Sequence, residues 1–228
     1  MSIPPASAYA SRTSGTFGRE VSFFDAVYGF AATLLISNVD APPAEAWRSL
    51  DALLASGVAT QSLGFLLSFV VIVAIWRANV RLVRRLRGLD SVTTVINLGA
   101  SASAVFLAFT TQGISDPHSS ELPLPTALYA LNIAVAILGQ SVMFQVARAR
   151  GLERVPTTPR ENLVSLSIVL VTPAVFVLSV PMAFWIGPDA AKLSWLSLLV
   201  LGPISGIVGA RILPPRSEDE GRPGQPSS

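Results

Sequence analysis

Seven polar side chains lie inside stretches of the sequence that are otherwise apolar. They are one acid, three amides and three hydroxyls: Asp25, Asn97, Asn132, Gln140, Thr33, Ser37 and Ser68. Hydroxyls are weak signals, because they can bond back to carbonyl groups of their own helix. The acid and the amides are stronger signals, since a polar group in hydrocarbon is costly and normally faces protein or water. For the amides, hydrogen bonds that fix the packing between helices are favoured over direct contact with an ion.

Motifs of known enzyme and metal sites are missing from the sequence. It contains no HExxH, no GxSxG, no Walker loop and no Cys, and its single histidine, His118, cannot form a histidine metal site alone. His118 falls in the short stretch DPHSSELP, where a solvated loop residue is favoured over a proton sensor. We therefore expect no catalytic residues, no metal site and no cofactor.

Composition indicates which elements must hold these polar residues. Of the 228 residues, 51% are hydrophobic and only 13% are charged, which is typical of a membrane protein. Six stretches lack Asp, Glu, Lys and Arg, and most match the ~20 residues of a spanning helix: 26–39, 52–76, 91–115, 122–147, 162–188 and 193–210. The first reaches a full span only if it starts near Val21 and includes Asp25. The sequence therefore predicts an all-α integral membrane protein with six transmembrane helices.

Basic residues are distributed unevenly over the connections between these spans. Of the 16 Lys and Arg residues, 14 fall on the side that both termini share, and only Arg48 and Lys192 fall on the other. Because cytoplasmic loops carry the excess of positive charge, we expect a multi-pass protein of the cell membrane with both termini cytoplasmic. The basic helix ends would meet anionic lipid headgroups, so no nucleic-acid partner is required. We expect a cytoplasmic segment at 1–20, a channel-like domain at 21–213 and a disordered cytoplasmic tail at 214–228.

The first predicted span carries a recognisable pattern. Arg19, Phe23, Phe24 and Asp25, within REVSFFDAVYGFAATLL, resemble the Arg-x-x-x-Phe-Ser-Asp sequence that opens the first helix in the transmembrane protein 175 family of potassium channels. Further similarity is spread over the second, third and fourth spans: Ser68, Phe69, Trp76, Asn97 and ALYALN at 127–132. The fifth and sixth spans are similar only in hydropathy. Bacterial members of this family have six spans per subunit, as predicted here.

Two positions depart from the family pattern. Phe24 stands where the motif has Ser, so any hydrogen bond of that hydroxyl is missing. Asn79 stands where the family commonly has His, three residues after Trp76. An amide keeps hydrogen-bonding capacity but does not titrate, which removes the imidazole as a source of proton dependence.

The resemblance implies a potassium channel of leak type with its pore on the first helix. Five, eight and twelve residues after Asp25, the positions that match pore-lining layers of relatives are Phe30, Thr33 and Ser37. Their spacing places them on one face of a helix. No TVGYG filter is present, so a Phe30 constriction with hydroxyl layers would have to select K⁺ by dehydration. A central pore needs several copies around an axis, and we predict a homotetramer. Without the resemblance, an ordinary helix-packing face is favoured.

Asp25 is interpreted as a structural clamp rather than an ion-binding site. We expect it in the first turns of a helix, where the helix dipole favours negative charge. Its carboxylate would accept hydrogen bonds from neighbouring helices, with Asn79 and Asn97 near the same interface. Arg19, Phe23 and Trp76 complete this predicted set of structural residues.

The sequence is also compatible with two other functions. A secondary transporter would use broken helices near the midplane, and candidate breaks exist at Pro173, Pro181 and Gly202–Pro203 with Gly206. The first half of the chain offers no matching Pro-interrupted helix. The third possibility is a non-conducting scaffold.

Overall fold

The computed structural model describes residues 10–11 and 14–212, and most of these residues are helical. Within this part of the chain, six helical segments are long and apolar enough to cross a membrane, which agrees with the predicted number. They are α1 (Gly15–Leu34, followed by a 3₁₀ turn Leu35–Asn38), α3 (Val58–Arg84), α4 (Ser91–Ser115), α5 (Pro123–Ala149), α6 (Pro159–Trp185), and α7 (Pro188–Ser194) with α8 (Leu198–Ile212). The predicted tail at 214–228 lies outside the described residues.

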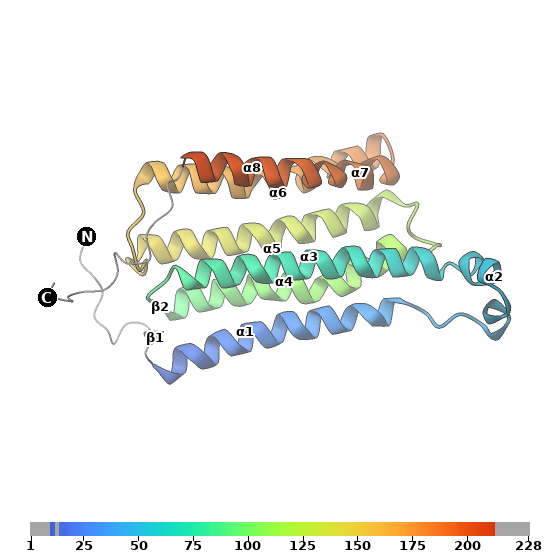
Figure 1. Cartoon of the computed structure of the whole chain (residues 1–228), viewed down its shortest axis with the longest axis horizontal. Coiled ribbons are helices and arrows are strands. Elements are labelled where there is room, and N and C mark those ends of the chain that lie inside the picture. Colours follow the sequence, from blue (N-terminus) through green and yellow to red (C-terminus); the bar gives the residue numbers. More distant parts are fainter. Residues whose placement is uncertain (1–9, 12–13, 213–228) are drawn as a thin grey trace, which may run out of the picture.

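The spanning helices form an elongated bundle (Figure 1). α1 runs along one edge, α6 and α8 run along the opposite edge, and α3, α4 and α5 lie between them. α5 is the most deeply buried of the six spans. The helix that begins the bundle and the helix that ends it are therefore its outermost elements, and each leaves one long side without a neighbour in the subunit.

α1 begins earlier than the apolar pattern suggests. Ser14 caps it by accepting a hydrogen bond from the Phe17 backbone N–H, and the helix runs from Gly15 through the polar residues before Val21. Asp25 therefore lies in the third turn, and the expectation that it meets the positive end of the helix dipole is wrong. The apolar run marks where a helix meets hydrocarbon, whereas the cap marks where the helix begins.

The connection after α1 contains short helices that could not be recognised from the stretches without charged residues. A 3₁₀ segment (Ala44–Arg48) and α2 (Leu50–Ala55) precede α3. Gly57 stands between α2 and α3 with φ +85°, a left-handed conformation that favours glycine. Residues 52–57, the start of the predicted span 52–76, are thus the end of a short outer helix and a turn, and the spanning helix begins at Val58.

The two prolines inside α6 do not interrupt that helix. Pro173 and Pro181 both lie within the continuous segment Pro159–Trp185, and Pro203 lies within α8. The sixth span is instead divided by a 3₁₀ turn at Trp195–Ser197. The indole Nε1 of Trp195 donates to Ser179 Oγ of α6 at 2.9 Å, which holds this turn against the bundle.

Loops at the end where α1 begins are joined by short strand pairings. β1 (Ala10–Ser11) pairs antiparallel with β2 (Gly88–Leu89), and Leu86 forms an antiparallel bridge with Glu153. The segment before α1, the α3–α4 connection and the α5–α6 connection are therefore tied together. All three belong to the side predicted to be cytoplasmic.

Candidate functional site

The stripe predicted on the first helix lies on its uncovered face. Phe30 has 70% of its surface exposed, and Thr33 and Ser37 are exposed as well. The opposite face of α1 buries Phe24, Tyr28, Ala31 and Leu35 against the bundle. The three stripe side chains are therefore largely uncovered within the subunit. Ser37 lies on the 3₁₀ turn that extends α1 rather than on the α-helix itself.

Both hydroxyls of the stripe donate to carbonyls of their own helix. Thr33 Oγ1 donates to Phe30 O at 2.9 Å, and Ser37 Oγ donates to Leu34 O at 2.6 Å. A hydroxyl whose hydrogen is used in this way still has oxygen lone pairs. On an exposed face, these lone pairs are available to a cation or to water.

Asp25 makes one contact between helices, with a residue of the predicted set. Trp76 Nε1 of α3 donates to Asp25 Oδ1 at 2.8 Å, and both side chains are exposed. Asn79 and Asn97, expected near the same interface, instead bond each other across α3 and α4, with Asn79 Nδ2 2.5 Å from Asn97 Oδ1. Both amides are buried. The structure thus brings the predicted residues together as two separate pairs.

The remaining residues of the first-helix pattern differ in their surroundings. Phe24, which replaces the motif Ser, is buried and packs edge-on to the Phe23 ring with centroids 6.0 Å apart. Phe23 and Arg19 are exposed on α1. Phe24 therefore contributes apolar packing at the start of the bundle.

The amides inside the spans make hydrogen bonds between helices. Asn132 Nδ2 of α5 donates to Ser103 O of α4 at 3.0 Å. Gln140 Nε2 of α5 donates to Tyr28 Oη of α1 at 2.9 Å and to Ile75 O of α3 at 3.0 Å. These are the packing contacts expected of amides in a membrane helix. Sequence reasoning selected Gln140 but missed its partner, because Tyr28 is one aromatic residue among several.

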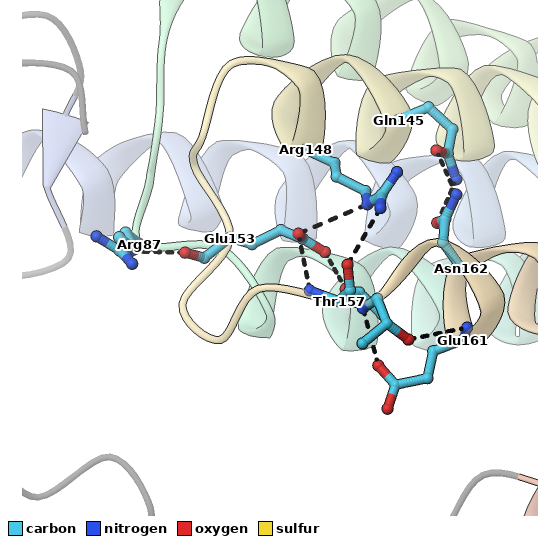
Figure 2. A network of polar contacts seen from close by, with 8 residues as sticks. Arg87, Gln145, Arg148, Glu153, Thr157, Glu161 and Asn162 are labelled. Atoms are coloured by element: carbon cyan, nitrogen blue, oxygen red, sulfur yellow. Dashed lines mark hydrogen bonds and ion pairs between the residues drawn. The ribbon is translucent and has the colours of Figure 1, made fainter. Parts of the chain in front are cut away.

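A polar network at the strand end of the bundle was also missed (Figure 2). Glu153 accepts from Thr157, lies 3.7 Å from Arg148 Nε, and its backbone O accepts from Arg87 Nε at 2.6 Å. Beside it, Gln145 of α5 and Asn162 of α6 exchange two hydrogen bonds of 2.9 and 3.0 Å. The spacing of Thr158 and Glu161 is that of a capping box, so the start of α6 could have been predicted from the sequence. The pairing of the α3–α4 connection with the α5–α6 connection could not have been predicted in this way.

Asp90 is another acid at this end of the bundle. It caps α4 by accepting from the Thr93 backbone N–H at 2.9 Å, and it pairs with Arg150 Nε from the next connection. Burial alone would raise the pKa of Asp90, but the hydrogen bonds from Thr93 and the Arg150 guanidinium lower it below its ordinary value. Asp90 is therefore held ionised where two loops meet.

Comparisons with known proteins show a family match over part of the chain and a similar fold. Residues 19–107 match the family model described as the endosomal/lysosomal potassium channel TMEM175. The fold is similar to the crystal structure of a lysosomal potassium-selective channel TMEM175 homologue from Chamaesiphon minutus, with a TM-score of 0.67 and 17% sequence identity. That similarity covers 84% of this chain and 99% of the other. No curated protein sequence matches significantly.

The family model covers α1, α3 and most of α4, the helices that carry the predicted stripe and its polar neighbours. The structural similarity covers 84% of the chain and therefore reaches beyond residue 107. Residues 19–107 therefore carry the sequence pattern of the TMEM175 family and the chain has the fold of a bacterial TMEM175 homologue, which confirms the family resemblance predicted from the sequence.

Proposed function

We propose that this chain is the subunit of a homotetrameric potassium channel of leak type in the cell membrane. In this proposal the exposed face of α1 lines the axis, Phe30 forms the constriction, and Thr33 and Ser37 form hydroxyl layers. The observation that carries it is the position of α1 at the edge of the bundle with Phe30 70% exposed. The match to a potassium channel family over residues 19–107 supports the choice of ion.

The chemistry of the stripe suits permeation by a weakly hydrated cation. A ring of Phe30 side chains offers no oxygen, so an ion passing it must lose part of its water. K⁺ gives up water more easily than Na⁺, and the Thr33 and Ser37 oxygens compensate part of that loss. Selection of this kind needs no carbonyl filter.

A secondary transporter is the alternative, and the structure offers it little support. The candidate breaks at Pro173 and Pro181 lie within a continuous α6. The one division of a span in the second half, at Trp195–Ser197, is packed against α6 by its tryptophan. Transport that saturates and depends on a co-substrate would favour the transporter, whereas ohmic current that reverses near the K⁺ equilibrium potential favours the channel.

The deciding experiment measures reversal potentials of the purified protein in lipid bilayers under a K⁺/Na⁺ gradient. Phe30→Ala is expected to raise conductance and weaken K⁺ preference, because ions keep more water at a wider constriction. Thr33→Ala is expected to lower K⁺ preference, and Ser37→Ala to do less. If Phe30→Ala conducts and reverses where the parent does, α1 does not line the pore through this residue.

A further inference from the structure

Gln140 links three helices at one buried point. Its Nε2 donates to Tyr28 Oη of α1 at 2.9 Å and to Ile75 O of α3 at 3.0 Å, and Gln140 itself belongs to α5. Gln140 and Tyr28 are each only 2% exposed. The Gln140 side-chain NH₂ therefore makes two hydrogen bonds to neighbouring helices in an apolar surrounding, where such bonds are strong.

This contact lies directly behind the proposed constriction. Tyr28 and Phe30 are two residues apart on α1, which separates them by about 200° around the helix and about 3 Å along it. Tyr28 faces the bundle, whereas Phe30 faces away from it. A change in the rotation or height of α1 at Tyr28 would therefore move Phe30 by a similar amount.

The other side chains on the buried face of α1 near this point are Phe24, Ala31 and Leu35. Apolar contacts of this kind are non-directional, so they hold the face against the bundle without fixing its rotation strongly. A hydrogen bond depends on distance and angle and therefore does fix rotation. Asp25 bonds Trp76 of α3 and Asn38 bonds Ala108 O of α4 farther from Phe30 along the span, whereas Tyr28 is only two residues from it. α5, which supplies Gln140, is the most buried span and offers a firm anchor.

We propose that Gln140 is a positioning residue for α1, which through Tyr28 sets the rotation of the helix and hence the width of the Phe30 constriction. This inference rests on the proposed function, in which Phe30 faces the axis. Gln140 would not contact the ion. Its effect on selectivity would pass through the hydroxyl of Tyr28.

The test compares two Tyr→Phe variants that each remove one buried hydroxyl. Tyr28→Phe removes the contact between α1 and α5, together with the interaction of the same hydroxyl with Ser101 of α4. Tyr129→Phe is the matched control, since Tyr129 of α5 is fully buried and shares a 3.1 Å hydrogen bond with Ser68 Oγ of α3 without involving α1. Both are measured for thermal stability, oligomeric state and reversal potential in a K⁺/Na⁺ gradient, beside Gln140→Leu and Phe30→Ala.

We expect Tyr28→Phe and Gln140→Leu to change the K⁺/Na⁺ permeability ratio by about two-fold or more, within the range that single contacts in coupled networks carry. The double variant should change it by less than the sum of the two single changes, because the two variants share the Gln140–Tyr28 contact. Tyr129→Phe should lose similar stability and keep the parent ratio.

Two results would overturn the inference. If Tyr28→Phe and Gln140→Leu reverse where the parent does while Phe30→Ala shifts, Gln140 does not position the constriction and the proposed function stands. If Tyr129→Phe shifts the ratio as much as Tyr28→Phe, the effect comes from general loosening of the bundle. If Phe30→Ala has the reversal potential of the parent, the proposed function itself is contradicted, whatever the result for Tyr28→Phe.

Discussion

At the scale of single residues, Asp25 acts through hydrogen bonding in this structure rather than through the helix dipole. Its oxygen accepts from Trp76 Nε1 at 2.8 Å, three turns into α1. The contact requires an acceptor at residue 25 but not a negative charge. It also joins the pore helix of the proposal to α3, close to the face on which copies of the subunit would meet.

This contact leads to a prediction for Asp25. Asp25→Ala leaves the Trp76 indole without its acceptor, at a cost of about 1 kcal/mol for a neutral hydrogen bond and somewhat more for a charged one. We expect a smaller tetramer fraction by size-exclusion chromatography and native mass spectrometry. Asp25→Asn keeps an oxygen that can accept from Trp76 and should therefore keep most of the parent's tetramer fraction.

The ion preference of Asp25→Ala distinguishes a structural role of Asp25 from a role in permeation. In the proposed clamp role, assembled Asp25→Ala channels keep the parent reversal potential. A stable Asp25→Ala tetramer with altered K⁺ preference would make Asp25 a permeation residue instead.

Residues also show how far the sequence could be interpreted. Gln140, Asn132, Asn97 and Asp25 were identifiable because a polar group in hydrocarbon needs a partner. The partners of Gln140 and Asn132 were not identifiable, since a backbone carbonyl such as Ile75 O or Ser103 O has no sequence signal. The three stripe positions came from the family resemblance, and their spacing alone was also compatible with a packing face.

At the scale of elements, hydropathy predicted all six spans but not how they begin or divide. α1 begins at Gly15 because Ser14 caps it, whereas hydropathy starts near Val21. The sixth span divides at Trp195–Ser197, where side-chain contacts with α6 favour a 3₁₀ turn. The loop pairing of Leu86 with Glu153 joins segments far apart in sequence, which no local pattern records.

The capping of α4 by Asp90 predicts a specific pH dependence. Its pKa is lowered in the folded protein, so the ionised form contributes stability at pH above about 4, the ordinary value for Asp. That contribution is lost as pH falls through the lowered pKa. Asp90→Asn keeps a capping oxygen but cannot titrate. We expect its apparent melting temperature in detergent to be lower than the parent's at pH 7 and to approach the parent's in acid.

The control for this prediction is Asp189→Asn on α7. Asp189 has 85% of its side chain exposed and lies 3.5 Å from Lys192, a surface pair of the kind that contributes little. Its melting temperature should follow the parent at every pH. An Asp90→Asn variant whose curve runs parallel to the parent's down to acid would show that the Asp90 charge does not stabilise the fold.

At the scale of the whole molecule, the proposed tetramer requires that one edge of the bundle meets other subunits and the opposite edge meets lipid. α1 and α6 lie at these two edges (Figure 1). Phe30 of α1 and Leu178 of α6 are both 70% exposed. Phe30 lies eight residues before Asn38, where its span ends, and Leu178 lies seven residues before Trp185, where its own ends. The two positions are therefore matched in exposure and in depth.

The chain has no cysteine, so a single introduced thiol can be cross-linked without a background. Phe30→Cys in liposomes, treated with a short bifunctional thiol reagent, should give covalent dimers, because copies of α1 around a narrow axis lie within its reach. Leu178→Cys should stay monomeric under the same treatment, since α6 faces lipid in the proposed tetramer. Cross-linking of Leu178→Cys but not of Phe30→Cys would place the subunit contact on the α6 edge, and α1 would then be a peripheral helix rather than the lining of a pore.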